Sequence, residues 1–181
     1  MIQFNELDRT ASIMRMVPGL FIKNYYKSIL NIGAGPNRFD YSDEFKQAGY
    51  DVTVMEYYQD NCDNLKISMP WLKNIICGDV KNINLSEKYD VVFWWHGPEH
   101  LLSDDISPTV MNLERLCNKV IILGCPWGEY KTECGGPTDY NPAGHNSHND
   151  YQIFENIGYS VECLGSKDVH GSNITAVKYI N

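Results

Sequence analysis

Five short runs of β-branched and other apolar residues recur along the chain, separated by stretches of mixed polarity. The runs are Ser28–Ile32, Asp51–Glu56, Asn74–Asp79, Tyr89–Trp95 and Lys119–Gly124. Nearly continuous apolar runs of this length are typical of strands covered on both faces of a parallel sheet. Parallel neighbours need crossover segments, so we expect an α/β fold with helices between the strands.

The segments between the runs supply the expected helices. These are Tyr41–Ala48, Gln59–Lys66, Ser107–Asn118 and Asp150–Asn156, with an N-terminal helical segment, 1–27, that covers Ala11–Tyr26 and is interrupted at Pro18-Gly19. The clearest is Ser107–Asn118, where Pro108 lies near the start and Val110 and Leu113 follow at helical spacing.

The end of the chain follows a different pattern. Gly158–Leu164 and Asn173–Tyr179 both have strand character, and the segment between them is too short for a crossover helix. They are therefore expected to pair as an antiparallel hairpin. Since 181 residues suit one core, we predict one domain, 1–181, with a mostly parallel seven-stranded sheet and an antiparallel C-terminal hairpin.

The charge and the apolar runs restrict the partners. The net charge is −8 and the basic residues are scattered, which disfavours a broad nucleic-acid surface. No apolar run is long enough to span a bilayer, and the N-terminus lacks the apolar core of a signal peptide.

The cysteines indicate a reducing compartment. The six cysteines, at positions 62, 77, 117, 125, 134 and 163, form no Cys-x-x-Cys pair. With no secretion signal they are expected to be reduced and mostly buried thiols, which predicts a cytoplasmic protein.

A glycine turn, Gly33-Ala34-Gly35, follows the first expected strand. It lacks the third glycine of the Gly-x-Gly-x-x-Gly pattern, so alone it fits a simple tight turn equally well. Glu56 ends the second strand 23 positions after Gly33, where a carboxylate can accept hydrogen bonds from ribose hydroxyls. Asp79 ends the third strand. The carboxyl ends of parallel strands share one edge of the sheet, so these features predict a nucleotide-like binding site there.

This arrangement resembles the class I S-adenosylmethionine-dependent methyltransferases. The resemblance covers roughly Ile29 to Ile180 and is carried by Leu30-Asn31-Ile32-Gly33-Ala34-Gly35, Val54-Met55-Glu56-Tyr57, Gly78-Asp79-Val80, Tyr89-Asp90-Val91-Val92-Phe93 and the final hairpin. It implies a Rossmann-like, doubly wound sheet and S-adenosyl-L-methionine as cofactor. The cofactor-binding residues it implies are Asn31, Gly33, Ala34, Gly35, Glu56, Tyr57, Asp79, Val80 and Trp95.

Within that resemblance, the glycines would lie under the methionine portion of the cofactor, Glu56 on the ribose, and Asp79 with Val80 on the adenine. The sequence departs from the family at two positions. Asn31 stands where many members have an acidic residue, and Asn37 where many have a third glycine. These departures leave a degenerate site as an alternative.

The segment after the fourth strand, Trp94-Trp95-His96-Gly97-Pro98-Glu99-His100, holds the candidate catalytic residues His96, Glu99 and His100. His96 has the chemistry of a general base, and Glu99 could orient it or bind a cationic substrate. Trp95 could stack on a ring or hold a sulfonium. In the alternative interpretation the tryptophans are core residues and the histidines cap a turn.

A metal site is the weaker interpretation of the same residues. His145 and His148 add to the local histidines, and Cys125 and Cys134 lie between. No Cys-x-x-Cys pair and no Glu directly after the first histidine is present, so no metal ligand set is predicted.

A long segment, 125–149, follows the fifth strand and is dense in Gly, Pro, Asn, Tyr and His. Loops of this length are often functional, so we expect a substrate lid that carries Trp127, Tyr130, Tyr140 and His145. A surface loop packed on its own domain is the alternative.

Together these features predict an S-adenosylmethionine-dependent methyltransferase acting on a small molecule by in-line displacement. A noncatalytic cofactor-binding or partner-binding module with a decayed active site is the alternative. A nicotinamide-dependent oxidoreductase is disfavoured by the missing third glycine and the terminal hairpin. Assembly into a homo-oligomer stays open.

Overall fold

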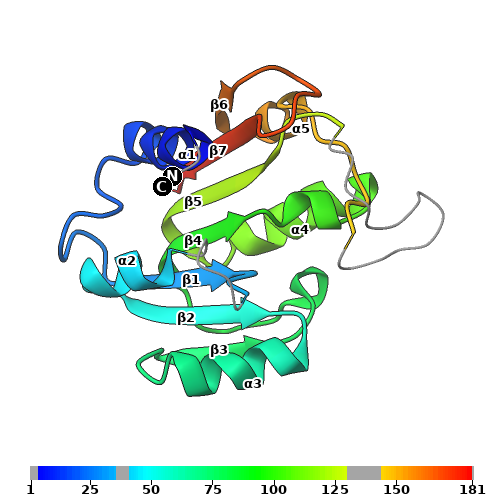
Figure 1. The fold of residues 1–181 in the computed structure, drawn as a ribbon. Helices are drawn as coiled ribbons and strands as arrows, with labels where there is room; N and C mark the ends of the chain where they lie inside the picture. Colours follow the sequence, from blue (N-terminus) through cyan, green and yellow to red (C-terminus); the bar gives the residue numbers. More distant parts are fainter. Residues whose placement is uncertain (1–3, 36–40, 130–143, 181) are drawn as a thin grey trace.

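The computed structural model describes residues 4–35, 41–129 and 144–180, and Figure 1 shows the arrangement of its helices and strands. The strands are β1 (Ser28–Ile32), β2 (Asp51–Glu56), β3 (Asn74–Cys77), β4 (Tyr89–Trp95), β5 (Cys117–Pro126), β6 (Ser160–Leu164) and β7 (Asn173–Tyr179). The α-helices are α1 (Phe4–Met16), α2 (Ser42–Gln47), α3 (Gln59–Ser68), α4 (Ser103–Glu114) and α5 (Gln152–Glu155). Two short 3₁₀ turns, η1 (Val80–Asn82) and η2 (Pro98–His100), follow β3 and β4.

The seven strands form one sheet in the order β3-β2-β1-β4-β5-β7-β6 (Figure 1). The first five are parallel to one another, and β7 runs antiparallel to both β5 and β6. The predicted α/β fold, with its seven-stranded, mostly parallel sheet and antiparallel C-terminal hairpin, is confirmed. The chain order reverses direction at β1, which lies between β2 and β4, and such switch points are where open α/β sheets bind ligands.

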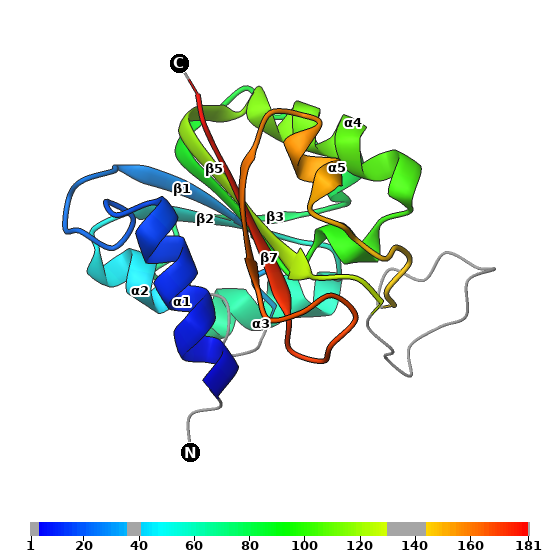
Figure 2. The same ribbon diagram turned by 90° about the horizontal axis from the view of Figure 1, so that it is seen from above.

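Helices cover both faces of the sheet (Figure 2). Ile13 of α1, Phe45 of α2 and Leu65 of α3 belong to one apolar core, whereas Ile106 of α4 and Phe154 of α5 belong to the other. Because side chains alternate along a strand, consecutive residues of one strand enter different cores. This alternation decides which side chains of β4 can reach the site.

Several helix bounds differ from those expected. Helix α4 begins at Ser103 instead of Ser107 and contains Pro108 in its interior. The apolar residues Ile106, Val110 and Leu113 are all fully buried, and their packing outweighs the hydrogen bond that a proline removes. The N-terminal prediction is also wrong in its bounds, because α1 ends at Met16 and turns follow it. The fifth strand extends to Pro126, so Cys125 and Pro126 belong to the sheet and not to the loop.

Helix α1 is fastened to the C-terminal hairpin by polar contacts. Ser12 is fully buried, and its hydroxyl lies 2.8 Å from Glu162 Oε2 and 2.9 Å from Thr175 Oγ1. Arg15 forms an ion pair with Glu162, in which its Nε donates to Oε1 over 3.1 Å. These contacts place α1 against β6 and β7.

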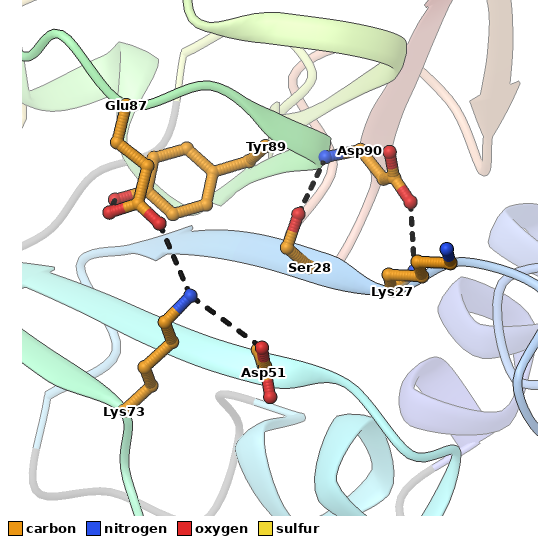
Figure 3. A network of polar contacts seen from close by, with 7 residues as sticks. All are labelled: Lys27, Ser28, Asp51, Lys73, Glu87, Tyr89 and Asp90. Carbon is orange, nitrogen blue, oxygen red and sulfur yellow. Dashed lines mark hydrogen bonds and ion pairs between the residues drawn. The ribbon is translucent and has the colours of Figure 1, made fainter.

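A second polar network ties the amino ends of the strands together, at the edge away from the glycine turn (Figure 3). Lys73 Nζ lies 3.2 Å from Glu87 Oε1 and 3.5 Å from Asp51 Oδ2. Asp90 accepts a hydrogen bond from the Lys27 N–H, and its own N–H donates to Ser28 Oγ. Asp90, which is part of the family resemblance, therefore joins β1 to β4 and lies outside the cavity described below.

Within the residues that the structure describes, every helix is too short or too polar to cross a bilayer. The five described cysteines are free thiols, of which Cys62, Cys117 and Cys125 are buried. Burial raises the pKa of the Cys117 and Cys125 thiols, which keeps them protonated at neutral pH. Cys134 lies outside the described residues.

Candidate functional site

A cavity opens at the carboxyl ends of β1, β2, β3 and β4. Its lining includes five residues predicted to bind a cofactor and two predicted to be catalytic: Gly33, Glu56, Tyr57, Asp79, Val80, His96 and His100. The topology explains why residues so far apart in the sequence meet, because parallel strands all present their carboxyl ends at this edge.

Gly33, the first residue of the glycine turn, lines this cavity. Gly33 has φ +72° and Gly35 has φ +55°, both in the left-handed region that favours glycine. The Gly33 N–H donates to the Met55 carbonyl over 2.8 Å, which fixes the turn against β2. A Cβ built on Gly33 would meet no atom of the described residues within 4 Å, so the backbone there borders open cavity space.

Glu56 joins the glycine turn to the following helix. The residue is 5% exposed. Its Oε1 accepts a hydrogen bond from the Gly35 N–H over 2.7 Å, and its Oε2 accepts one from the Asn61 amide over 3.1 Å. The carboxylate is therefore held in place at the end of β2. Asn61 also lines the cavity, although no motif in the sequence distinguishes it.

Asp79 and Val80 form the wall contributed by the end of β3. Asp79 precedes η1, and its Oδ1 accepts a hydrogen bond from the Lys81 N–H over 2.9 Å. This cap fixes the turn that brings Val80 to the cavity. Tyr57 and Tyr58, which are both exposed, stand at the end of β2 with their rings edge to face.

Four predicted cofactor residues do not line the cavity. Ala34 is buried in the core beneath the turn, and Gly35 contributes the N–H that Glu56 accepts. Asn31 is 1% exposed and donates from its amide to Ser42 Oγ over 3.0 Å, so it fastens β1 to the start of α2.

The fourth is Trp95, which lies in the core on the opposite face of the sheet, where its ring stacks on Phe93. Trp94 lines the cavity instead. Both rings fill space left by glycines: a Cβ on Gly97 would lie 1.6 Å from Trp94 Nε1, and one on Gly124 would lie 2.1 Å from Trp95 Cε3. The alternation along β4 sets this difference, and the sequence alone does not say which of two adjacent tryptophans faces the ligand side.

His96 lies at the end of β4 in a hydrogen-bonded chain of three side chains. Its φ is +52°, a conformation that side chains other than glycine seldom adopt. Arg9 Nη1 donates to His96 Nε2 over 2.9 Å, because a guanidinium can only donate. The proton of a neutral His96 is then on Nδ1, which lies 3.1 Å from Glu99 Oε1 and donates to it. No local pattern in the sequence indicates Arg9, which is 87 positions away on α1.

Glu99 is the buried member of that chain, with 2% of its surface exposed. Burial alone would raise its pKa, but the hydrogen bond from His96 and the electrostatic interaction with the nearby His96 and His100 rings lower the pKa below its ordinary value. Glu99 is therefore ionised at neutral pH. His96, Glu99 and His100 border a second, more polar cavity together with Arg9 and His145. His96 and His100 line both cavities, which places the two side by side.

Of the segment expected to act as a lid, 125–149, the structure describes residues 125–129 and 144–149. His145 lines the second cavity, and burial lowers the pKa of its imidazole, which is then neutral at pH 7. Trp127 packs against Tyr151, and its Nε1–H donates to Asp150 over 3.4 Å. Tyr130 and Tyr140 lie outside the described residues, as does Asn37.

The chain shares its architecture with solved methyltransferase structures. The N-methyltransferase NodS from Bradyrhizobium japonicum WM9 superposes with a TM-score of 0.70 at 10% identity, over 98% of this chain and 97% of that one. Magnesium protoporphyrin IX methyltransferase (ChlM) from Synechocystis PCC 6803 with bound SAM gives 0.63 at 12% identity, over 100% and 86%. The fold is that of the Rossmann-like methyltransferases.

A third structure with this methyltransferase fold is SAM-bound CalS10, an amino pentose methyltransferase from Micromonospora echinaspora. It gives a TM-score of 0.63 at 13% identity, over 95% of this chain and 89% of that one. The sequence matches no family model and no curated protein. The methyltransferase fold is therefore visible in the three-dimensional arrangement and not in overall sequence similarity.

Proposed function

We propose that this protein binds S-adenosyl-L-methionine in the first cavity and transfers its methyl group to a small molecule. The observation that carries the proposal is the convergence of the Gly33 turn, Glu56, and Asp79 with Val80 on one cavity at the switch point of the sheet. Similar solved structures hold SAM, as in ChlM and CalS10, or S-adenosyl-l-homocysteine, as in NodS.

The residues present fit such a ligand. The open space over Gly33 admits a chain that lies close to the backbone, and a side chain at that position would fill it. Glu56 presents a buried carboxylate suited to two hydroxyl donors, and Asp79 presents an acceptor suited to an amine. When bound, the cofactor would supply a methyl group activated by a sulfonium.

The chain's own contribution would be alignment and the exclusion of water. The ring of Trp94 and the side chain of Leu101 give the cavity an apolar wall next to His96 and His100. In this proposal His96 and His100 border the acceptor, and Glu99 positions His96 through Nδ1. Arg9 donates to Nε2 of His96, so proton removal at that nitrogen requires the Arg9 hydrogen bond to break first.

Calorimetric titration of the full chain tests the proposal. S-adenosylmethionine and S-adenosylhomocysteine should each bind with one site per chain, and NAD should not bind. Failure of both sulfur compounds to bind at millimolar concentration would overturn the proposal.

The second candidate function is a cofactor-binding module without activity. The observation that favours it is Asn31, which is buried against Ser42 and supplies neither a charge nor a contact to the cavity. The two functions differ in turnover. Release of S-adenosylhomocysteine in the presence of a panel of small amines, alcohols and phenols supports the methyltransferase, and binding without turnover over the whole panel supports the module.

A further inference from the structure

The second cavity brings together three groups that can bind a metal ion. One ligand atom from each of Glu99, His100 and His145 lies within 4.8 Å of the other two. Neither Glu99 nor His145 lines the cofactor cavity, so this cluster is separate from the cofactor-binding residues. Of the three residues in the cluster, only His100 lines both cavities.

One carboxylate oxygen of Glu99 takes no part in the hydrogen bonds that the described residues form. Oε1 is bonded to His96, but Oε2 is buried and has no hydrogen-bond partner among the described residues. Leaving a buried acceptor unsatisfied costs about 1–3 kcal/mol, and more for a charged group. A cation bound to this buried carboxylate oxygen, next to two imidazoles, would remove that cost.

His100 is held in the tautomer that a metal ligand needs. Its Nδ1 lies 3.0 Å from the Gly144 carbonyl oxygen, which can only accept, so Nδ1 carries the proton. Nε2 of the neutral ring then has its lone pair available for a metal. A histidine that binds a metal through one ring nitrogen usually donates the N–H of the other to a group such as a backbone carbonyl.

The backbone fixes His145 beside these two residues. The N–H groups of Asn146 and Ser147 both donate to the Glu99 carbonyl, over 2.8 and 3.2 Å, and the Asn146 amide donates to the His100 carbonyl over 2.7 Å. The rings of His100 and His145 lie edge to face with centroids 5.4 Å apart. The segment that carries His145 is thus attached to the 98–100 turn by five hydrogen bonds, counting that of His100 to the Gly144 carbonyl and that of the Ser147 hydroxyl to the Pro98 carbonyl.

We infer that Glu99 Oε2, His100 Nε2 and the His145 imidazole form a binding site for a divalent transition metal ion, with zinc as the fitting probe. Two imidazoles and one carboxylate are a ligand set of catalytic zinc sites, which keep a further position open. The ligand atoms of the three residues lie within 4.8 Å of one another, and a tetrahedral ion with ligands at about 2.0 Å needs them about 3.3 Å apart, so each pair must approach by about 1.5 Å at most. Rotation of the side chains supplies such a movement.

The site would place an ion beside the proposed methyl acceptor. The second cavity has a volume of about 300 Å³ and also contains Arg9, so a ligand with an anionic or hydroxyl oxygen fits next to the ion. A metal-bound hydroxyl has a lowered pKa and is a better nucleophile. This consequence rests on the proposed methyltransferase function, whereas metal binding itself does not.

Metal binding is measured on the full chain after a chelator has removed bound metal. The affinity for Zn²⁺ is measured by competition with a chromophoric chelator. Binding of Co²⁺, in a separate sample, is measured by visible absorption. One ion per chain is expected. His145→Asn and Glu99→Gln should each weaken Zn²⁺ binding at least about 100-fold, because even outer-sphere changes weaken binding 10–100-fold. His148→Asn is the matched control, since His148 is exposed on the same segment and lies outside the cluster; it should bind as the unmodified chain does.

Circular dichroism of each metal-free variant separates loss of the site from loss of the fold, and His145→Asn provides the result if Glu99→Gln fails to fold. Calorimetry with S-adenosylmethionine on the same samples keeps the two proposals distinct, because the His145→Asn chain should retain cofactor binding. Absence of Zn²⁺ binding at micromolar concentration, or equal binding by His145→Asn and the unmodified chain, would overturn the metal site whatever the cofactor result.

Discussion

Glu56 Oε1 accepts a hydrogen bond from the backbone N–H of Gly35 over 2.7 Å, so the carboxylate proposed for the ribose also closes the glycine turn. The end of β2 and the glycine turn are therefore one unit, and the shape of the turn beside the cavity depends on the Glu56 carboxylate. A ligand that engages Glu56 acts on the turn as well.

Replacing Glu56 with Gln should weaken the binding of S-adenosylmethionine about 10- to 100-fold. The substitution keeps the size of the side chain but removes the negative charge, and hydrogen bonds to charged groups contribute about 1.5–3 kcal/mol. Calorimetric titration measures the change. Glu87→Gln is the control, because Glu87 lies at the opposite edge of the sheet, and it should leave the affinity unchanged. Equal affinity in both variants would remove Glu56 from the site.

Replacing Gly33 with Ala should reduce both stability and cofactor binding. A left-handed conformation costs a residue with a Cβ about 1–2 kcal/mol, and the new methyl group would occupy open cavity space. Gly158→Ala is a matched control, since Gly158 has φ +88° and lies away from the cavity. Urea unfolding should show similar losses in the two variants, and only Gly33→Ala should lose affinity. A loss of affinity in Gly158→Ala of the same size would contradict this assignment.

Trp94 and Trp95 should respond differently to substitution with Phe. Trp94→Phe should lower the affinity for S-adenosylmethionine and abolish any change in tryptophan fluorescence on binding, because Trp94 lines the cavity. Trp95→Phe should lower the free energy of unfolding by about 1–3 kcal/mol through lost packing on Phe93 and Gly124, with little effect on affinity. If Trp95→Phe lowered the affinity and Trp94→Phe lowered only the stability, Trp95 would be the residue that contacts the ligand.

The Glu162 contacts should stabilise the protein at neutral pH and not in acid. Burial alone would raise the pKa of Glu162, but hydrogen bonds from Arg15 and Ser12 lower the pKa below its ordinary value. A lowered pKa in the folded state means that the contribution is present above the ordinary glutamate pKa of about 4.3 and is lost as the pH falls through the folded value.

Glu162→Gln should therefore destabilise the protein by about 1 kcal/mol at pH 7, while the two forms converge near pH 3. Urea unfolding at both pH values measures this. Glu155→Gln, on the exposed side of α5, is the control and should change little at either pH. A destabilisation by Glu162→Gln that persists at pH 3 would point to lost packing in place of the ionised contact.

Much of the sheet can be predicted from the sequence, because a strand buried on both faces needs a nearly unbroken apolar run. The bounds of β1, β2 and β4 are as expected for this reason. Helix bounds are harder, as α4 illustrates. A proline ordinarily marks the start of a helix, but burial of Ile106, Val110 and Leu113 fixed the helix register and left Pro108 inside.

The candidate site also has parts that the sequence predicts and parts that it does not. Glu56 and Asp79 follow from the ends of predicted strands, and both line the cavity. Three relationships do not follow from any local pattern: Arg9 with His96, His145 with Glu99, and the face that each of two adjacent tryptophans occupies. They depend on how α1 docks, on where a distant loop returns and on the register of β4 with β1.

The fit of the Trp95 ring over Gly124 has a consequence for the history of the chain. Any residue larger than glycine at position 124 would overlap the indole, and any smaller residue at position 95 would leave a void above the glycine. A substitution at either position alone would therefore give a less stable protein. In diverging descendants of this sequence the two positions should therefore be inherited as a pair, with bulk lost from one only where it is gained at the other.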